Sequence, residues 1–204
     1  MRDPKVSRRE LLRQLGMTGA GILALPQLSR VLAFQQQARR QAVAPQGALS
    51  AAEAATLAAV CARLIPTDDA GPGAAEARAS VYIDRSLSGW LAGSRQTYAD
   101  GLAQIDAAAR AAHNRSFVEL TASEQDGVLA GIEQSPFFSL VRTHTIQGTF
   151  CDPEYGGNAN FIGWDLLGYP GIRLTVTAAD QRMSQYPQPV RRSAYDYAMF
   201  AAAH

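Results

Sequence analysis

The chain has 204 residues, of which 47% are hydrophobic and 18% charged, so it can form one compact core and is not an intrinsically disordered protein. Its net charge of +1 conceals an asymmetry. Residues 1–33 hold six of the 19 basic residues and two of the 18 acidic ones, which leaves residues 34–204 with a net charge of −3. This mildly acidic balance argues against nucleic acid as a partner.

The N-terminus has the features of an export signal. Arg8 and Arg9 precede an apolar stretch over residues 15–25, which is shorter than the roughly 20 residues that span a membrane. Small residues offer a cleavage site after Ala33 and a second one after Ala44. The paired arginines and modest hydrophobicity resemble twin-arginine signals. They predict export of the folded protein to the periplasm by the twin-arginine translocase.

A helical domain is predicted over residues 50–173, after a polar linker over residues 34–49. Its first helix begins at the capping box Ser50-Ala51-Ala52-Glu53 and ends at Pro66. A loop rich in glycine and proline follows and contains Asp68-Asp69. Adjacent acids at such a position are typical of turns and caps, which we favour over a metal or acid/base pair.

Four further helices are predicted from apolar periodicity and cap residues: residues 74–91, a helix after Gly93-Ser94, one from the capping box Thr121–Glu124 and one from Ser135-Pro136. Trp90 and Trp164 are expected to anchor the packing. His144 lies on the apolar face of the last of these helices, and we interpret it as a core or interface histidine. The fold class is therefore all-α, a compact bundle of about five helices.

The C-terminal part has no steady period. Residues 149–171 interleave glycine, proline, asparagine and aromatic residues, which predicts an irregular structured loop with one helical turn at residues 164–167. Residues 174–204 read as an extended tail because of their prolines. Its aromatic rings exceed what a small domain has room to bury, so we expect the tail to lie along a partner.

Motifs for catalysis or cofactor binding are absent from the sequence. It contains no His-Glu-x-x-His, no Cys-x-x-Cys, no Gly-x-Ser-x-Gly and no Gly-x-Gly-x-x-Gly. We therefore predict no catalytic, cofactor-binding or metal-binding residue in this chain. A signal for folded export on such a chain indicates that a partner carries the cofactor.

The two cysteines receive different interpretations. Cys61 lies on the apolar face of the first helix and is predicted to be a buried thiol. Cys151 lies in the irregular loop, where exposure is expected. A disulfide between them would close a loop of about 90 residues and stabilise the fold by roughly 4 kcal/mol. The sequence leaves open whether Cys151 is free, bonded to Cys61 or bonded to another chain.

Several clusters of residues resemble the gluconate 2-dehydrogenase small subunit (subunit 3) family. They are Phe137-Phe138, Thr145, Gly148, Asp152-Pro153-x-Tyr155-Gly156-Gly157-Asn158, Gly163-Trp164 and Gly168-Tyr169-Pro170-Gly171. The loop over residues 65–74 is similar as well. The resemblance runs from the leader to about residue 171, and nothing after residue 173 contributes to it.

The resemblance implies a small non-catalytic subunit of a membrane-associated periplasmic complex that oxidises a sugar or sugar acid. An FAD-dependent flavoprotein of the glucose–methanol–choline (GMC) type would be the catalytic partner, and a multihaem cytochrome c would pass the electrons onward. This chain would supply the export signal and stabilise the flavoprotein. The expected partner interface consists of Cys151, Asp152, Tyr155, Asn158, Trp164 and Tyr169. The alternative is an independent exported enzyme or small-molecule-binding protein.

Overall fold

The computed structural model describes residues 47–178, 181–182 and 188–201. Within these ranges the chain is all-helical, as predicted, and contains no strand. The α-helices are α3 (Ala51–Leu64), α4 (Ala79–Leu87), α5 (Arg95–His113), α6 (Ala122–Ala130), α7 (Pro136–Phe150), α8 (Ile162–Leu166) and α9 (Ala198–Ala201). Short 3-10 helices are η1 (Ala92–Ser94), η2 (Phe117–Glu119), η3 (Pro153–Tyr155), η4 (Ala159–Phe161) and η5 (Ala194–Asp196). The predicted export signal, with Arg8 and Arg9, lies outside the described residues.

Three helices begin where their cap residues predict. The Ser50 hydroxyl accepts a hydrogen bond from the Glu53 amide, and the Glu53 carboxylate accepts one from the Ser50 amide at 2.7 Å. Thr121 caps α6 by the same reciprocal pattern. Ser135 caps α7, with Pro136 at the first helical position. The structure confirms these three helix starts, which were predictable because each cap joins residues within four positions of each other.

The second predicted helix is shorter than expected. Its apolar period suggested residues 74–91, whereas α4 begins only after Arg78, whose φ of 57° is left-handed. Turns replace the first five residues, and the Ala74 amide donates to the carbonyl of Ile65 at 2.9 Å. Trp90 lies beyond the end of α4 and is 66% exposed, so its expected role as a packing anchor is wrong. Trp164 is buried, as predicted.

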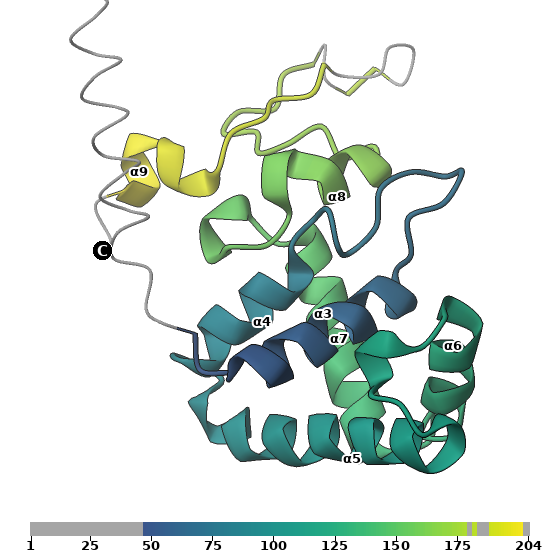
Figure 1. The fold of residues 1–204 in the computed structure, drawn as a ribbon. Coiled ribbons are helices and arrows are strands. Elements are labelled where there is room, and N and C mark those ends of the chain that lie inside the picture. Colours follow the sequence, from purple (N-terminus) through teal and green to yellow (C-terminus); the bar gives the residue numbers. More distant parts are fainter. Residues whose placement is uncertain (1–46, 179–180, 183–187, 202–204) are drawn as a thin grey trace, which may run out of the picture. The chain divides into compact units, whose positions relative to one another are not determined.

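The core is one cluster of apolar side chains from helices α3 to α7. Close approach between these helices depends on small residues. A side chain at Gly101 of α5 would overlap the Phe137 ring of α7, since a Cβ there would lie 2.3 Å from it. A Cβ at Gly148, near the other end of α7, would lie 2.8 Å from the Ala79 carbonyl oxygen of α4. Figure 1 shows residues 149–171 at that end of α7, away from α5.

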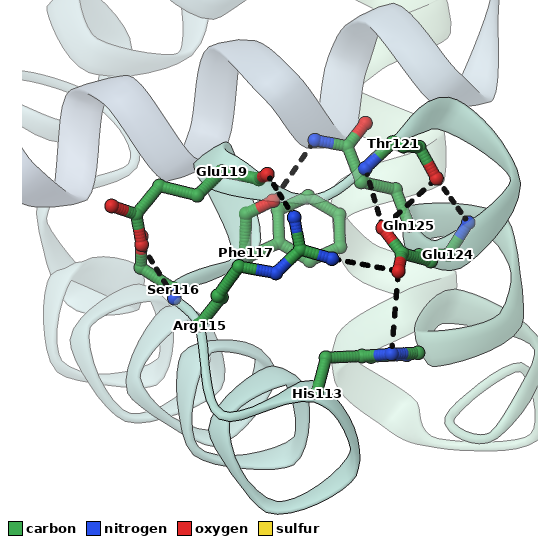
Figure 2. A network of polar contacts seen from close by, with 8 residues as sticks. All are labelled: His113, Arg115, Ser116, Phe117, Glu119, Thr121, Glu124 and Gln125. Carbon is green, nitrogen blue, oxygen red and sulfur yellow. Dashed lines mark hydrogen bonds and ion pairs between the residues drawn. The ribbon is translucent and has the colours of Figure 1, made fainter.

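Figure 2 shows the polar network that fixes the connection from α5 to α6. The Glu124 carboxylate accepts hydrogen bonds from the Thr121 amide at 2.8 Å and from Arg115 at 2.7 Å. His113 Nδ1 lies 3.6 Å from the same carboxylate. The hydrogen bonds from Thr121 hold the pKa of Glu124 below its usual value. The network therefore orients α6 against the end of α5.

Replacing Gln125 by alanine should destabilise this connection. The Gln125 side chain is buried, and its amide donates to the Phe117 carbonyl at 2.9 Å. Without it the carbonyl keeps only the longer hydrogen bond from the Leu120 amide, at 3.3 Å, and loss of the buried hydrogen bond costs about 1 kcal/mol. Chemical denaturation measures the loss. The matched control is Gln104→Ala on the exposed face of α5, where the free energy of unfolding should not fall. Equal values for the two variants would contradict the assignment.

Candidate functional site

The acidic residues and histidines are the first candidates for catalytic or metal-binding geometry. Among the described residues, no group of three or more His, Cys, Asp or Glu side chains is placed to hold a metal ion. Asp68 forms a turn, because its carboxylate accepts from the Ala70 amide at 2.8 Å and its backbone pairs with Gly71. Asp69 is exposed beside it. The turn assignment of this acidic pair is confirmed.

His144 is a core histidine, as predicted. It is 6% exposed, and its Nδ1 lies 2.8 Å from the Tyr98 hydroxyl. The two rings stack at 5.9 Å between centroids, and the Trp90 ring meets His144 edge-on at 6.4 Å. Burial lowers the pKa of His144 and raises that of Tyr98. At neutral pH both groups are therefore uncharged and serve to hold α5 on α7.

Acidification should destabilise the fold through His144. Because its pKa is lower in the folded chain, the unfolded chain binds a proton first as the pH falls below about 6.5. The stabilising contribution of neutral His144 is therefore fully present above that pH and is lost as the pH falls below it. Thermal unfolding at pH 7.5 and pH 5 measures this. The His144→Gln variant, whose amide can still reach Tyr98, should lose less of its melting temperature over the same interval. An equal loss would contradict the assignment.

Residues 149–171, called the signature segment from here on, begin with the last two residues of α7, and the residues that follow pack backbone to backbone against the end of that helix. A Cβ at Gly157 would lie 2.0 Å from the Gly148 carbonyl oxygen, and a Cβ at Gly163 would lie 2.0 Å from that of Thr149. Real Cβ atoms do not approach so closely, so both positions require glycine. The glycines of the sequence pattern are therefore contact points between the segment and α7.

Asn158 fixes the segment from inside. It is fully buried, its Nδ2 donates to the Cys151 carbonyl at 2.8 Å, and its Oδ1 accepts from the Gly163 amide at 2.7 Å. Its own amide donates to Gly148 at 2.8 Å. The residue adopts a left-handed backbone with φ 42°, which asparagine tolerates better than most residues. Asn158 thus ties both halves of the segment to each other and to α7.

The structure separates the six predicted interface residues into two groups. Asn158 and Trp164 are buried within the chain, and Trp164 donates its indole N–H to the Phe150 carbonyl at 3.1 Å. Both shape the segment, and Trp164 also lines the Tyr169 pocket, so contact of these two residues with a partner stays a proposal. The others reach the surface or line a pocket: Cys151, Asp152, Tyr155 and Tyr169.

Two open pockets flank the Phe150 ring. The Trp90 pocket has a volume of about 580 Å³ and a mostly apolar lining of Tyr82, Trp90, Ile146, Gln147, Phe150, Cys151 and Tyr155. The Tyr169 pocket has a volume of about 610 Å³ and is lined by Phe150, Asp152, Trp164, Leu167, Gly168, Tyr169 and Pro170. Five exposed large apolar side chains belong to them: Trp90, Ile146, Tyr155, Leu167 and Tyr169.

Some of these lining residues were not identified from the sequence. The sequence predicts Trp90 to be a packing anchor, and no motif in it singles out Ile146 or Phe150. The position of Ile146 could have indicated a surface contact, because it is an apolar residue off the apolar face of its helix. In the structure its side chain is 42% exposed. Trp90, which follows α4, and Tyr155, which follows α7, line the same pocket through tertiary packing that no local sequence pattern indicates.

Both cysteines are free thiols in the structure. Cys61 is buried, as predicted, and lies 3.3 Å from the Thr145 hydroxyl, which donates to the Val141 carbonyl. Cys151 is half-buried at the edge of the Trp90 pocket. Burial raises the pKa of Cys61 to about 12 and that of Cys151 to about 11, so neither is a thiolate at neutral pH. A bond from Cys151 to another chain stays a proposal.

None of the described helices combines the length and the apolar character needed to cross a membrane. No curated protein and no solved structure shows a significant similarity to the chain. A family model does match it, that of gluconate 2-dehydrogenase subunit 3, over residues 51–171. The matched range begins with α3 and ends with the signature segment, and it covers more than half of the chain. The chain therefore belongs to the gluconate 2-dehydrogenase subunit 3 family, whose description implies a subunit of that dehydrogenase complex.

Proposed function

We propose that the chain is the non-catalytic small subunit of a membrane-associated periplasmic complex that oxidises a sugar or sugar acid. In this proposal a GMC-type flavoprotein holds the FAD and performs the oxidation, and a multihaem cytochrome c accepts the electrons. The small subunit carries the twin-arginine signal, with Arg8 and Arg9, and leaves the cytoplasm bound to the folded flavoprotein. It afterwards stabilises that subunit in the complex.

The observation that carries the proposal is the surface around Phe150. Both pockets are open, the Trp90 pocket is mostly apolar and the Tyr169 pocket is mixed, and exposed aromatic side chains border them in the part of the chain that matches the family. Exposed apolar patches of this kind mark interaction sites in soluble proteins. Aromatic side chains are frequent hot spots, with truncation costing about 2 kcal/mol or more. Trp90, Tyr155 and Tyr169 are the anchors that we assign to the flavoprotein contact.

The alternative is a small-molecule-binding protein. The volume of the Trp90 pocket supports it, since ligand pockets typically measure about 300–1,000 Å³. Such pockets also need a few convergent polar groups to orient the ligand. Here the polar lining consists of Gln147, the Cys151 thiol and the hydroxyls of Tyr82 and Tyr155. The Tyr82 hydroxyl already lies 3.4 Å from Gln147, and that of Tyr155 pairs with Tyr195. We therefore favour a protein partner.

Co-expression with a flavoprotein gene that neighbours this one and lacks an export signal tests the proposal. Periplasmic, sugar-dependent dye reduction is the expected result, and deletion of this chain should leave the flavoprotein cytoplasmic or degraded. Replacing Arg8 and Arg9 by lysine should retain both proteins in the cytoplasm. A Trp90→Ala/Tyr169→Ala variant should still be exported by itself but should lose the flavoprotein. An active, exported flavoprotein in the absence of this chain would refute the proposal.

A further inference from the structure

The C-terminal tail returns to the signature segment. Residues 190–197, called the strap, lie beyond the matched region, and the sequence predicts them to be extended along a partner. They include the 3-10 helix η5 and pack on this chain, so these residues are not simply extended, and their contact with a partner stays a proposal. The Val190 amide donates to the Pro170 carbonyl at 2.7 Å. A Cβ at Gly171 would lie 2.1 Å from the Val190 carbonyl oxygen, so the two backbones are in direct contact.

Asp152 connects the strap to the start of the signature segment. One carboxylate oxygen accepts from the Ser193 hydroxyl at 2.6 Å, and the other accepts from the Ala194 amide at 2.7 Å. The first oxygen also accepts from the Glu154 amide at 3.0 Å. Ser193 is 7% exposed, so this junction is largely shielded from water. Hydrogen bonds to an ionised group are worth more than those between neutral groups.

Two further contacts extend the junction. The hydroxyls of Tyr155 and Tyr195 lie 2.8 Å apart, with their rings perpendicular at 6.0 Å between centroids. This hydrogen bond raises the pKa of Tyr155 to about 12. Arg191 forms an ion pair with Asp165 of α8 at 2.6 Å. The strap therefore contacts both ends of the signature segment.

These contacts reach one wall residue of each pocket. Tyr155 lines the Trp90 pocket and Asp152 lines the Tyr169 pocket, and the strap holds both side chains. It does so without closing either pocket, because Tyr155 is still 48% exposed and Tyr169 42%. The strap therefore contacts the pocket walls from the side and does not cover either pocket.

The segment needs such support because its backbone is strained. Asn160 and Phe161 have φ values of 57° and 63°, and an aromatic residue rarely adopts a left-handed backbone. Such strained conformations persist only where contacts with the surrounding structure hold them in place. The buried hydrogen bonds of Asn158 hold the segment from within, and the hydrogen bonds of the strap hold it from outside.

We infer that the strap is a positioning element, which holds the signature segment in the conformation that binds the flavoprotein subunit before that subunit arrives. The inference rests on the proposed function for the identity of the partner. Preorganisation of a binding surface raises affinity because the ordering entropy is not lost again on association. The strap thus increases the affinity for the partner although Ser193 and Arg191 line neither pocket.

The test uses a Ser193→Ala/Arg191→Gln variant of the full chain. Amide exchange at residues 152–157 should increase in the chain alone, and affinity for the co-expressed flavoprotein should fall about tenfold. The melting temperature should stay within a few degrees, since the core of α3 to α7 is untouched. Arg63→Gln is the matched control, because it breaks another Arg–Asp pair, with Asp126, at 2.7 Å. Ser193→Thr, which keeps the hydroxyl, should restore affinity when combined with the native Arg191.

The outcomes separate this inference from the proposed function. Unchanged exchange at residues 152–157 overturns the positioning role, whatever the partner does. Increased exchange with unchanged affinity overturns its link to docking, and a higher affinity would show instead that the strap inhibits binding. If the unaltered chain fails to bind the flavoprotein, the proposed function and the docking part of the inference fail together. The exchange measurement alone then decides whether the strap holds the segment.

Discussion

Replacing Gly157 by alanine should displace the signature segment from α7 and lower the free energy of unfolding by about 3 kcal/mol, the upper end of the usual cost of overpacking. The new Cβ would lie 2.0 Å from the Gly148 carbonyl oxygen and 3.1 Å from the Cys151 sulfur. Gly148 has no room to retreat, because it packs against Ala79 of α4. The same carbonyl accepts the Asn158 amide at 2.8 Å, so that hydrogen bond would be lost as well.

Gly127→Ala is the control for this substitution. Gly127 lies inside α6 and is exposed, and a methyl group there would meet no neighbouring atom within 4 Å, so alanine should stabilise the chain by about 1 kcal/mol. Urea denaturation should show a lower free energy of unfolding for Gly157→Ala and a higher one for Gly127→Ala than for the native chain. For Gly157→Ala, amide exchange should also rise across residues 149–171 while the core stays protected. A Gly157→Ala variant as stable as the native chain would show that the segment shifts away from Gly148 without cost.

The helix starts were predictable because their determinants are local. Ser50, Thr121 and Ser135 each cap an amide three residues away, so a short stretch of sequence contains the whole interaction. The single helical turn expected at residues 164–167 appears as α8 at Ile162–Leu166, although no side chain caps it. The all-α class follows from these starts and from the apolar faces between them.

The second helix and the interface residues were less predictable because they depend on distant contacts. Nothing near Arg78 signals its left-handed backbone, which follows the turns after Ala74, whose amide donates to the Ile65 carbonyl. The motif around Asn158 was recognised, yet a motif does not say which of its side chains are buried. Burial of Asn158 and Trp164 depends on the packing of the segment against α7, and exposure of Trp90 on where α4 ends.

The strap was unpredictable for the same reason. Asp152 and Ser193 are 41 residues apart, and no local pattern pairs them. The prolines in the tail indicated an extended chain, and the aromatic rings indicated a partner. Tyr195 instead pairs with Tyr155 of the same chain. Composition thus indicated that the tail packs on a surface, but only the tertiary structure identifies that surface.

Asn158→Ala should be the most damaging side-chain truncation in the signature segment. It removes the partner of the buried Gly163 amide and that of the part-buried Cys151 carbonyl, at about 1–3 kcal/mol each. We therefore expect a loss of about 3–5 kcal/mol in the free energy of unfolding, which is large for a single mutation. Docking of the flavoprotein should fail with it, because the walls of both pockets belong in part to this segment.

Asn160→Ala provides the matched control, since Asn160 shares the left-handed backbone, with φ 57° against 42° for Asn158, but is exposed. Alanine there adds only the backbone cost, about 1–2 kcal/mol. The difference between the two variants therefore measures the buried hydrogen bonds of Asn158. Asn158→Gly separates the backbone contribution from that of the side-chain hydrogen bonds. Glycine adopts the left-handed backbone without strain, so this variant should be about 1 kcal/mol more stable than Asn158→Ala. Equal losses for Asn158→Ala and Asn160→Ala in denaturant titrations would mean that backbone conformation alone, and not the side chain of Asn158, holds the segment against α7.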